Sequence, residues 1–126
     1  MQRTLPTLVM FTVVGCLVAN DSRAQVVKQE MAGVTNFNKI ESTVACAGAI
    51  NSSAIPEIKK MGYASIINLR LATEEGADVD GNIAAAKAAG IPYFHIPFSG
   101  AAPDPAVVDT FLKTITAPGV QPAFIH

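Results

Sequence analysis

The sequence has no tryptophan, two cysteines and few aromatic side chains, which make up 6% of its residues. Charges are also sparse and balanced: nine Lys and Arg stand against ten Asp and Glu, and Arg70 is the only arginine after residue 24. A basic face for nucleic acid or for an anionic membrane surface is therefore excluded, and we expect neither partner. At 126 residues the chain has room for one domain.

The longest apolar stretch lies near the N-terminus. It spans residues 5–19, begins shortly after Arg3 and is followed at once by Asn20-Asp21, so it is too short for a membrane span. Ser22-Arg23-Ala24 then places small residues at the two positions that signal peptidase reads. We therefore interpret residues 1–24 as a signal peptide cleaved after Ala24, which predicts a periplasmic or secreted protein with no membrane span.

A lipoprotein signal is the alternative interpretation of the same region. Residues 13–16 (VVGC) resemble a bacterial lipobox, which would leave Cys16 lipidated and the domain tethered to a membrane. Cleavage after Ala24 instead leaves Cys46 as the single cysteine, so the mature chain would have no intrachain disulfide. Because Cys46 falls in a predicted edge strand without a basic neighbour, we interpret it as an inert thiol.

Three segments repeat one pattern, in which a helical stretch is followed by a glycine and a short apolar strand. They are residues 55–69 with Gly62, residues 84–96 with Gly90, and residues 107–126 with Gly119. Such units predict an α/β fold with a mainly parallel sheet and crossover helices. Ligands of these sheets bind beyond the carboxyl ends of the strands, which here fall at Leu69-Arg70, Ile96-Pro97 and His126.

The segment before the first of these units has weaker signals. Residues 25–35 show no periodicity, and we interpret them as a flexible leader. Residues 37–40 and 43–47 are short strand candidates with turn residues between them. They predict a hairpin at one edge of the sheet.

Capping residues mark where the helices should begin. Ser52 or Ser53 is placed to cap the first helix, Asp78 or Asp80 the second, and Asp104, which precedes a proline, the third. Apolar side chains at helical spacing predict a buried stripe on the first and third helices. These positions are Ile55, Ile58 and Met61 in the first, and Val108, Phe111, Leu112 and Ile115 in the third.

Six short stretches follow one another between residues 35 and 126. They are residues 37–40 (FNKI), 66–70 (IINLR), 74–76 (EEG), 88–93 (AAGIPY), 96–97 (IP) and 124–126 (FIH). In this order they resemble the phosphatase-like domain of the beta-lactamase-hydrolase-like proteins, a branch of the cysteine-dependent dual-specificity and tyrosine phosphatases. The resemblance implies a dual-specificity-phosphatase-like fold and hydrolysis of phosphate monoesters. It also implies a phosphorylated small molecule or phosphoprotein as substrate, with no metal and no cofactor.

The resemblance also implies where the nucleophile belongs. In that superfamily the final strand ends in His, and the next residue is the nucleophilic Cys of an H-C-x-x-x-x-x-R loop. The sequence as given stops at His126, so residues 36–126 are expected to be a partial phosphatase-like domain, truncated at the C-terminus. Without the thiolate and its phosphate loop, this polypeptide by itself is expected to be inactive. By resemblance His126 would tune the thiolate, whereas its position alone predicts a solvated side chain.

Three further side chains near the strand ends are candidates for the site. By resemblance Asp104 is the general acid that protonates the leaving oxygen, and a plain helix cap is its alternative role. We interpret His95 as a hydrogen-bonded residue and not a metal ligand, because no second His or carboxylate lies at metal-ligand spacing. Arg70 is placed either to meet an anion or to pair with Glu74 or Glu75.

Two other functions remain open from the residues alone. A rhodanese-type sulfurtransferase is also an α/β protein with a cysteine loop after a strand. A non-catalytic periplasmic domain would instead bind a ligand at the strand ends. Whether the chain acts as an enzyme therefore stays open at this point.

Overall fold

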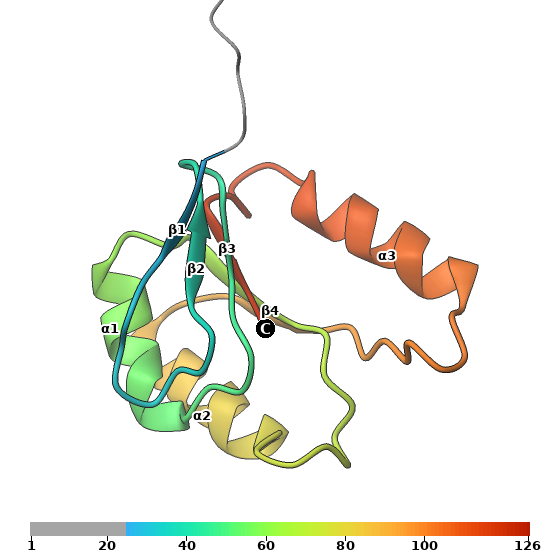
Figure 1. Cartoon of the computed structure of the whole chain (residues 1–126), viewed down its shortest axis with the longest axis horizontal. Helices are drawn as coiled ribbons and strands as arrows, with labels where there is room; N and C mark the ends of the chain where they lie inside the picture. Colours follow the sequence, from blue (N-terminus) through green and yellow to red (C-terminus); the bar gives the residue numbers. More distant parts are fainter. Residues whose placement is uncertain (1–24) are drawn as a thin grey trace, which may run out of the picture.

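The computed structural model describes residues 25–126. The signal peptide, the cleavage after Ala24 and the lipobox around Cys16 therefore lie outside the described residues. The described part forms one six-stranded sheet with helices packed against it (Figure 1). The strands are β1 (Val26–Lys28), β2 (Asn38–Ile40), β3 (Val44–Cys46), β4 (Ser65–Asn68), β5 (Tyr93–His95) and β6 (Ala123–Ile125). The helices are a 3₁₀ turn, η1 (Ser52–Ala54), followed by α1 (Ile55–Lys60), α2 (Val79–Ala89) and α3 (Pro105–Ile115).

The sheet is mixed, and its strand order is β1-β2-β3-β6-β4-β5. β3, β6, β4 and β5 pair in parallel, whereas β1, β2 and β3 pair antiparallel. The strands that lead to Leu69, Ile96 and His126 are parallel neighbours, with β4 between β6 and β5. The predicted α/β fold with a mainly parallel sheet is therefore confirmed. The predicted hairpin is β2–β3, which joins the parallel strands through β6. Its predicted place at the edge of the sheet is wrong, because β1 pairs with the outer side of β2.

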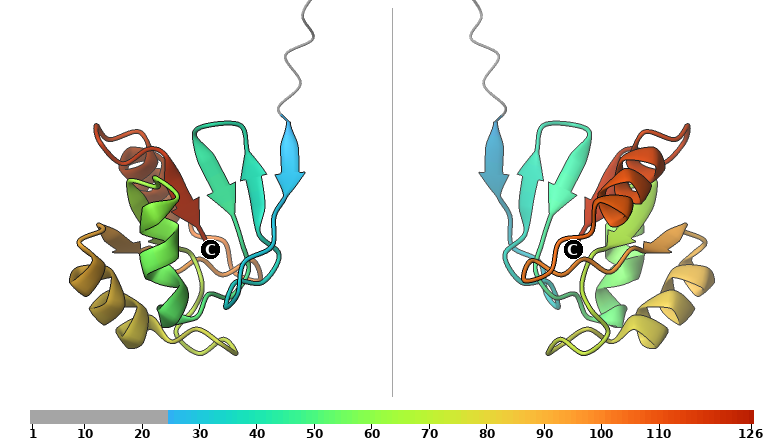
Figure 2. Two further views of the ribbon diagram at one scale, coloured as in Figure 1. Left: turned by 90° about the vertical axis from the view of Figure 1, so that its left-hand side faces the viewer. Right: turned by 90° about the vertical axis from the view of Figure 1, so that its right-hand side faces the viewer.

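Helices cover both faces of the sheet. Figure 2 shows α1 and α2 on one face and α3 on the other. The strands alternate accordingly, since neighbouring residues of a strand point to opposite faces. In β4, Ile66 packs with the core under α1 and α2, and Ile67 packs with the core under α3. Both side chains are fully buried, which explains why this strand reads as a continuous apolar run.

The core under α1 and α2 is centred on Phe124 of β6. Its ring lies 5.3 Å from the ring of Phe37 and 5.3 Å from the ring of Tyr63, the latter at an interplanar angle of 83°. Ile55 and Ile58 of α1 pack in the same cluster and are fully buried, as predicted. Met61 was predicted to join them, and this is wrong: it lies just after α1 and is 47% exposed.

The helix starts differ in how well their sequence signals predicted them. For α1, the cap expected from Ser52 or Ser53 is wrong, because Asn51 accepts the N–H of Ser53 and caps η1, which then continues into α1 without a side-chain cap. For α2, Asp78 is the cap and accepts the N–H of Gly81 at 3.1 Å. For α3, Asp104 is the cap, as predicted. Only for α1 did a preceding turn displace the cap.

The N-terminal segment contributes a strand that its sequence did not predict. Val26–Lys28 forms β1 and pairs with β2, within the residues 25–35 that we interpreted as a leader. All three residues of β1 are exposed, which is why the strand has no apolar periodicity. Since β1 and β6 flank the hairpin, β3 is an internal strand, and the placement of Cys46 in an edge strand is wrong as well.

The third helix packs on its face of the sheet through only part of its apolar surface. Val107, Phe111 and Ile115 contact the core under α3, but Val108 and Leu112 are 43% and 52% exposed. The predicted buried stripe is therefore wrong: Val108 and Leu112 are exposed, and Phe111 and Ile115 are only half-buried. The helix is oriented so that Val107, Phe111 and Ile115, which are four residues apart, face the sheet, whereas the residues that follow Val107 and Phe111 face away from it. Within residues 25–126, no helix has both the length and the apolar character needed to cross a membrane.

Candidate active site at the strand ends

The carboxyl ends of β4, β5 and β6 are joined by backbone hydrogen bonds. His126 donates its N–H to the carbonyl oxygen of Ile67 at 2.9 Å, and its own carbonyl oxygen accepts the N–H of Leu69 at 2.6 Å. On the other side of β4, the N–H of Ile96 donates to the carbonyl oxygen of Asn68 at 2.8 Å. These hydrogen bonds fix the backbone of the three strand ends relative to one another.

His126 is buried at this edge, with 5% of its surface exposed. The expectation of a solvated side chain is therefore wrong, because β6 is a central strand and its end is covered on both sides. Burial lowers the pKa of His126 to about 4, and the positive charges of Arg70 and His95 act in the same direction. The ring is consequently neutral at pH 7. Its Nδ1 is buried and has no hydrogen-bond partner among the residues that the structure describes.

Asn68 and Tyr93 lie directly beside His126. The Nδ2 of Asn68 donates to the Oη of Tyr93 at 2.8 Å, and Tyr93 Oη lies 3.5 Å from His126 Nε2. Asn68 is fully buried, and its Oδ1 accepts the backbone N–H of Arg70 at 2.8 Å. Burial raises the pKa of Tyr93, so its phenol keeps its proton at neutral pH. The sequence analysis did not identify either residue as part of the site. The available signal was Asn68, a polar amide at the end of an otherwise apolar strand.

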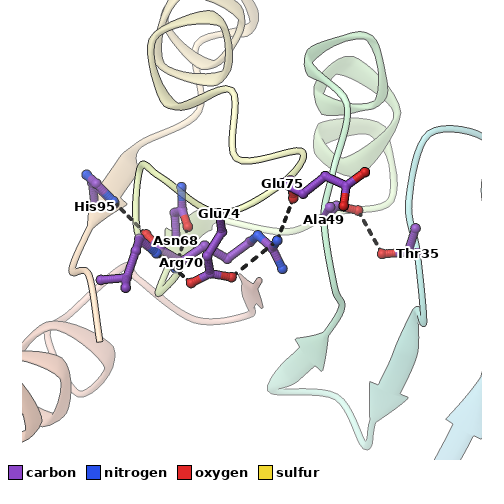
Figure 3. A network of polar contacts seen from close by, with 8 residues as sticks. Thr35, Ala49, Asn68, Arg70, Glu74, Glu75 and His95 are labelled. Atoms are coloured by element: carbon purple, nitrogen blue, oxygen red, sulfur yellow. Dashed lines mark hydrogen bonds and ion pairs between the residues drawn. The ribbon is translucent and has the colours of Figure 1, made fainter. Parts of the chain in front are cut away.

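Arg70 is held by the loop that follows β4 (Figure 3). Its Nη2 lies 3.2 Å from Glu74 Oε2 and donates to the carbonyl oxygen of Glu75 at 2.7 Å. Glu74 Oε1 also accepts the N–H of Leu71, which closes the loop on itself. The predicted pairing of Arg70 is confirmed for Glu74, whereas Glu75 contributes its backbone carbonyl oxygen and not its carboxylate. Its Nε is buried and has no partner within the described part of the chain.

His95 faces the same loop from the end of β5. Its Nε2 lies 2.9 Å from the carbonyl oxygen of Arg70, so the hydrogen-bonded role predicted for it is confirmed (Figure 3). Across residues 25–126, no three His, Cys, Asp or Glu side chains are grouped so that they could hold a metal ion.

Asp104 lies apart from this polar cluster. Its Oδ1 accepts the N–H of Ala106 at 2.9 Å, as a helix cap does, and its side chain is exposed. Among the described residues, no hydrogen bond or ion pair joins it to His126 or Arg70. The capping role is thus seen directly, whereas a role as general acid depends on groups that the described residues do not supply.

An apolar groove lies between the end of β4 and α3. It has a volume of about 170 Å³ and is lined by Leu69, Phe98, Val107, Val108 and Phe111. The backbone N–H of Phe98 donates to the carbonyl oxygen of Leu69 at 2.8 Å, which fixes the floor of the groove to the strand end. The exposed part of the apolar surface of α3 borders this groove.

Cys46 is the only thiol among residues 25–126. It lies in β3, is half-buried, and burial raises its pKa. A nucleophilic cysteine needs the opposite shift, since the thiolate is the reactive form. The interpretation of Cys46 as an inert thiol agrees with this environment.

The mostly parallel sheet with helices on both faces is a fold that this chain shares with solved structures of phosphatases. The comparisons with known proteins agree: the chain belongs to the family of the phosphatase-like domain of the beta-lactamase hydrolase-like proteins, whose sequence profile matches residues 36–124. No curated protein shows a significant sequence match to the chain.

Solved structures of phosphatases share the fold at low sequence identity. A protein from Shewanella putrefaciens CN-32 named "putative phosphatase (DUF442)" matches 75% of this chain and 59% of its own, with a TM-score of 0.67 and 20% identity. A Neisseria meningitidis protein named "putative phosphatase" matches 76% of this chain and 66% of its own, with a TM-score of 0.58 and 21% identity. The core catalytic domain of the PP-IP phosphatase SIW14 from S. cerevisiae, solved with citrate, matches 81% and 58%, with a TM-score of 0.57 and 20% identity. The chain thus spans about three fifths of the length of the Shewanella and yeast structures.

Proposed function

We propose that this chain supplies the sheet and the strand-end residues of an exported, cysteine-dependent phosphatase that hydrolyses phosphate monoesters. The observation that carries the proposal is the family match over residues 36–124, which leads directly to the buried His126 at the end of a central parallel strand. The substrate would be a phosphorylated small molecule or a phosphoprotein. The similar phosphatase structures support the class of reaction and leave the substrate to experiment.

The proposed chemistry needs a thiolate immediately after His126. That sulfur would attack phosphorus and form a sulfur–phosphorus bond, while the bond from phosphorus to the leaving oxygen breaks and that oxygen takes up a proton. Asp104 is the proposed donor of the proton, and water would then hydrolyse the phosphorylated cysteine. Residues 25–126 offer no substitute nucleophile, because the raised pKa of Cys46 keeps its thiol protonated.

Activity measurements on two lengths of the protein test this proposal. The first is the polypeptide of residues 1–126, and the second is the product of the natural gene read past the codon of His126. We expect only the longer product to hydrolyse p-nitrophenyl phosphate, and we expect changing the cysteine after His126 to serine to abolish that activity. Turnover by residues 1–126 that Cys46→Ser abolishes would contradict the proposal.

Export is part of the proposal and is tested separately. The support comes from residues 1–24, with their charged start, apolar stretch and small residues before Ala24. In a Gram-negative host we expect the protein in the periplasmic fraction with Gln25 as its N-terminal residue. Diacylglycerol on Cys16 would instead show the lipoprotein signal, and an intact cytoplasmic form would contradict export.

A further inference from the structure

The side chain of Asn82 is a polar group buried against the core under α1 and α2. Asn82 is fully buried, yet neither its Oδ1 nor its Nδ2 has a hydrogen-bond partner among residues 25–126. It lies on the face of α2 that packs on this core, because Ala85, Ala86 and Ala89 follow it at helical spacing and pack there. Buried amides in folded proteins are nearly always paired, so this side chain requires a partner within reach.

Tyr93 and Asp78 lie near this amide. Tyr93 belongs to β5 and packs in the same core. Burial raises the pKa of its phenol, the amides of Asn68 and Asn82 act to lower it and the carboxylate of Asp78 acts to raise it, so all three side chains lie near the hydroxyl. The carbonyl oxygen of Asp78 accepts the backbone N–H of Asn82 at 2.9 Å, which places Asp78 one helical turn before it. Their side chains are therefore neighbours on the helix surface.

The hydroxyl of Tyr93 has one proton to donate. Its oxygen accepts from Asn68 Nδ2 at 2.8 Å, and the orientation of that amide is fixed because Asn68 Oδ1 accepts the backbone N–H of Arg70. The proton of the hydroxyl therefore points to another acceptor. His126 Nε2 lies 3.5 Å from the hydroxyl oxygen, a distance longer than the hydrogen bonds that hydroxyl groups usually donate, so a closer acceptor is favoured.

The two ends of the Asn82 amide match its two neighbours in one orientation only. Its Oδ1 can accept the proton of Tyr93, and its Nδ2 can donate to the carboxylate of Asp78, which can only accept. The opposite orientation would place Oδ1 against the carboxylate, and two acceptors have no proton to share. Half a turn about the Cβ–Cγ bond exchanges the two ends, which are alike in shape. In the described part of the chain only Oδ1 of Asp78 accepts a hydrogen bond, from the N–H of Gly81 at 3.1 Å, so its Oδ2 is available.

We propose that Asn82 is a positioning residue that accepts the hydroxyl proton of Tyr93 on Oδ1 and donates from Nδ2 to the carboxylate of Asp78. Each donor then has an acceptor in one continuous chain of hydrogen bonds, which runs from the backbone N–H of Arg70 through Asn68, Tyr93 and Asn82 to Asp78. This chain ties the start of α2 to the ends of β4 and β5 and holds the Tyr93 ring at the candidate active site. The carboxylate at its end strengthens the bonds before it, because a charged acceptor polarises a series of hydrogen bonds. All five residues are described by the structure, so the inference does not rest on the proposed phosphatase function.

Proton–proton contacts in NMR spectra of the full wild-type chain measure the orientation of the Asn82 amide. We expect the Hδ2 protons of Asn82 to show stronger nuclear Overhauser effects to the Hβ protons of Asp78 than to the Hε ring protons of Tyr93. Asn68 is the internal reference, because its Nδ2 faces Tyr93 and its Hδ2 protons should show the effect to the ring. The reverse order of intensities for Asn82 would overturn the proposal.

An exchange of the two side chains tests the same pairing in urea unfolding at pH 7. Asn82→Asp buries a second carboxylate next to Asp78, and we expect it to lower the ratio of folded to unfolded chain at least about tenfold. Adding Asp78→Asn should restore most of this ratio, because Asn keeps the helix cap and its amide can donate to the new carboxylate. Asp80→Asn is the matched control: it removes an exposed acidic charge from the same first turn and should restore little. Equal restoration by both changes, or none by Asp78→Asn, would contradict the pairing.

Asn82→Leu distinguishes a paired amide from an unpaired one. Replacing an unpaired buried amide with an apolar side chain of similar size would raise the folded ratio, whereas removing a paired one lowers it. We expect Asn82→Leu to lower the ratio in the wild type and to lower it less in Tyr93→Phe, where the hydroxyl is already missing. Tyr63→Phe is the matched control, since Tyr63 precedes β4 and lies at the opposite end of that strand from Asn68; it should leave the effect of Asn82→Leu unchanged. A raised ratio, or an equal effect in Tyr93→Phe, would overturn the role of Asn82.

Discussion

Acid should destabilise this fold through one buried side chain, His126. Its pKa is lowered to about 4 in the folded chain, from an ordinary value of 6.5. Between these values the unfolded chain binds a proton at His126 and the folded chain does not, so the free energy of unfolding falls as the pH falls from 6.5 to 4. A difference of two to three pKa units corresponds to about 3 kcal/mol, a large share of the stability of a small domain.

Urea unfolding at pH 7.5 and at pH 4.5 measures this loss. The signal should be far-UV circular dichroism, because the chain has no tryptophan for fluorescence. Carboxylates also titrate in this range, so the quantity to compare is the loss of stability in the wild type minus the loss in His126→Gln. We expect this difference in the loss of stability to be most of the 3 kcal/mol. In His95→Gln we expect the free energy of unfolding to keep most of its wild-type dependence on pH. Equal losses in the wild type and in His126→Gln would refute the buried, neutral state of this ring.

Three further predictions concern other contacts of the same structure. Arg70→Gln should raise the pKa of His126 in an NMR titration, because it removes a positive charge that disfavours the imidazolium; an unchanged pKa would show that Arg70 does not contribute to the shift. Phe124→Ala should cost about 3–5 kcal/mol in urea unfolding, since its ring is fully buried against two others, and Phe98→Ala, at a 36% exposed position, should cost much less. Asp104→Ala should destabilise the chain by about 1 kcal/mol, whereas Asp104→Asn keeps the cap and should be near neutral. In the longer gene product the same Asp104→Asn change should lower kcat if this side chain is the general acid. An unchanged kcat would show that Asp104 acts only as the helix cap.

The parallel sheet could be predicted from the sequence because its signals are local. Each of the three units contains the local signals for a helix, a glycine that ends it and an apolar strand. Gly90, for example, ends α2 in the left-handed conformation, with a φ of 67°. The order of the strands does not follow from these units, since β6, which comes after β5 in the sequence, lies between β3 and β4. β1 could not be predicted, because its three residues are exposed and are ordered by pairing with β2 alone.

The site was less predictable because burial there is decided by distant segments. His126 is an ordinary terminal histidine in the sequence, and only its place between β3 and β4 removes it from water. Asn68 and Tyr93 meet across two paired strands that are separated by a helix in the sequence. Similarly, the apolar pattern of α3 gives the helix an apolar side but does not say which part of it faces the sheet, so Val108 and Leu112 were misassigned.

The position of β6 has a consequence for how the chain assembles. It is the last strand in the sequence, yet among the described strands it is the only one that hydrogen-bonds both the antiparallel half, β1–β3, and the pair β4–β5. A chain emerging from the ribosome therefore presents two open edges, on β3 and on β4, until Ala123–Ile125 arrives between them. Open strand edges pair readily with each other or with other chains. The arrival of these three residues therefore joins the two halves of the sheet and covers the free edges of β3 and β4, at which incorrect strand pairing could occur.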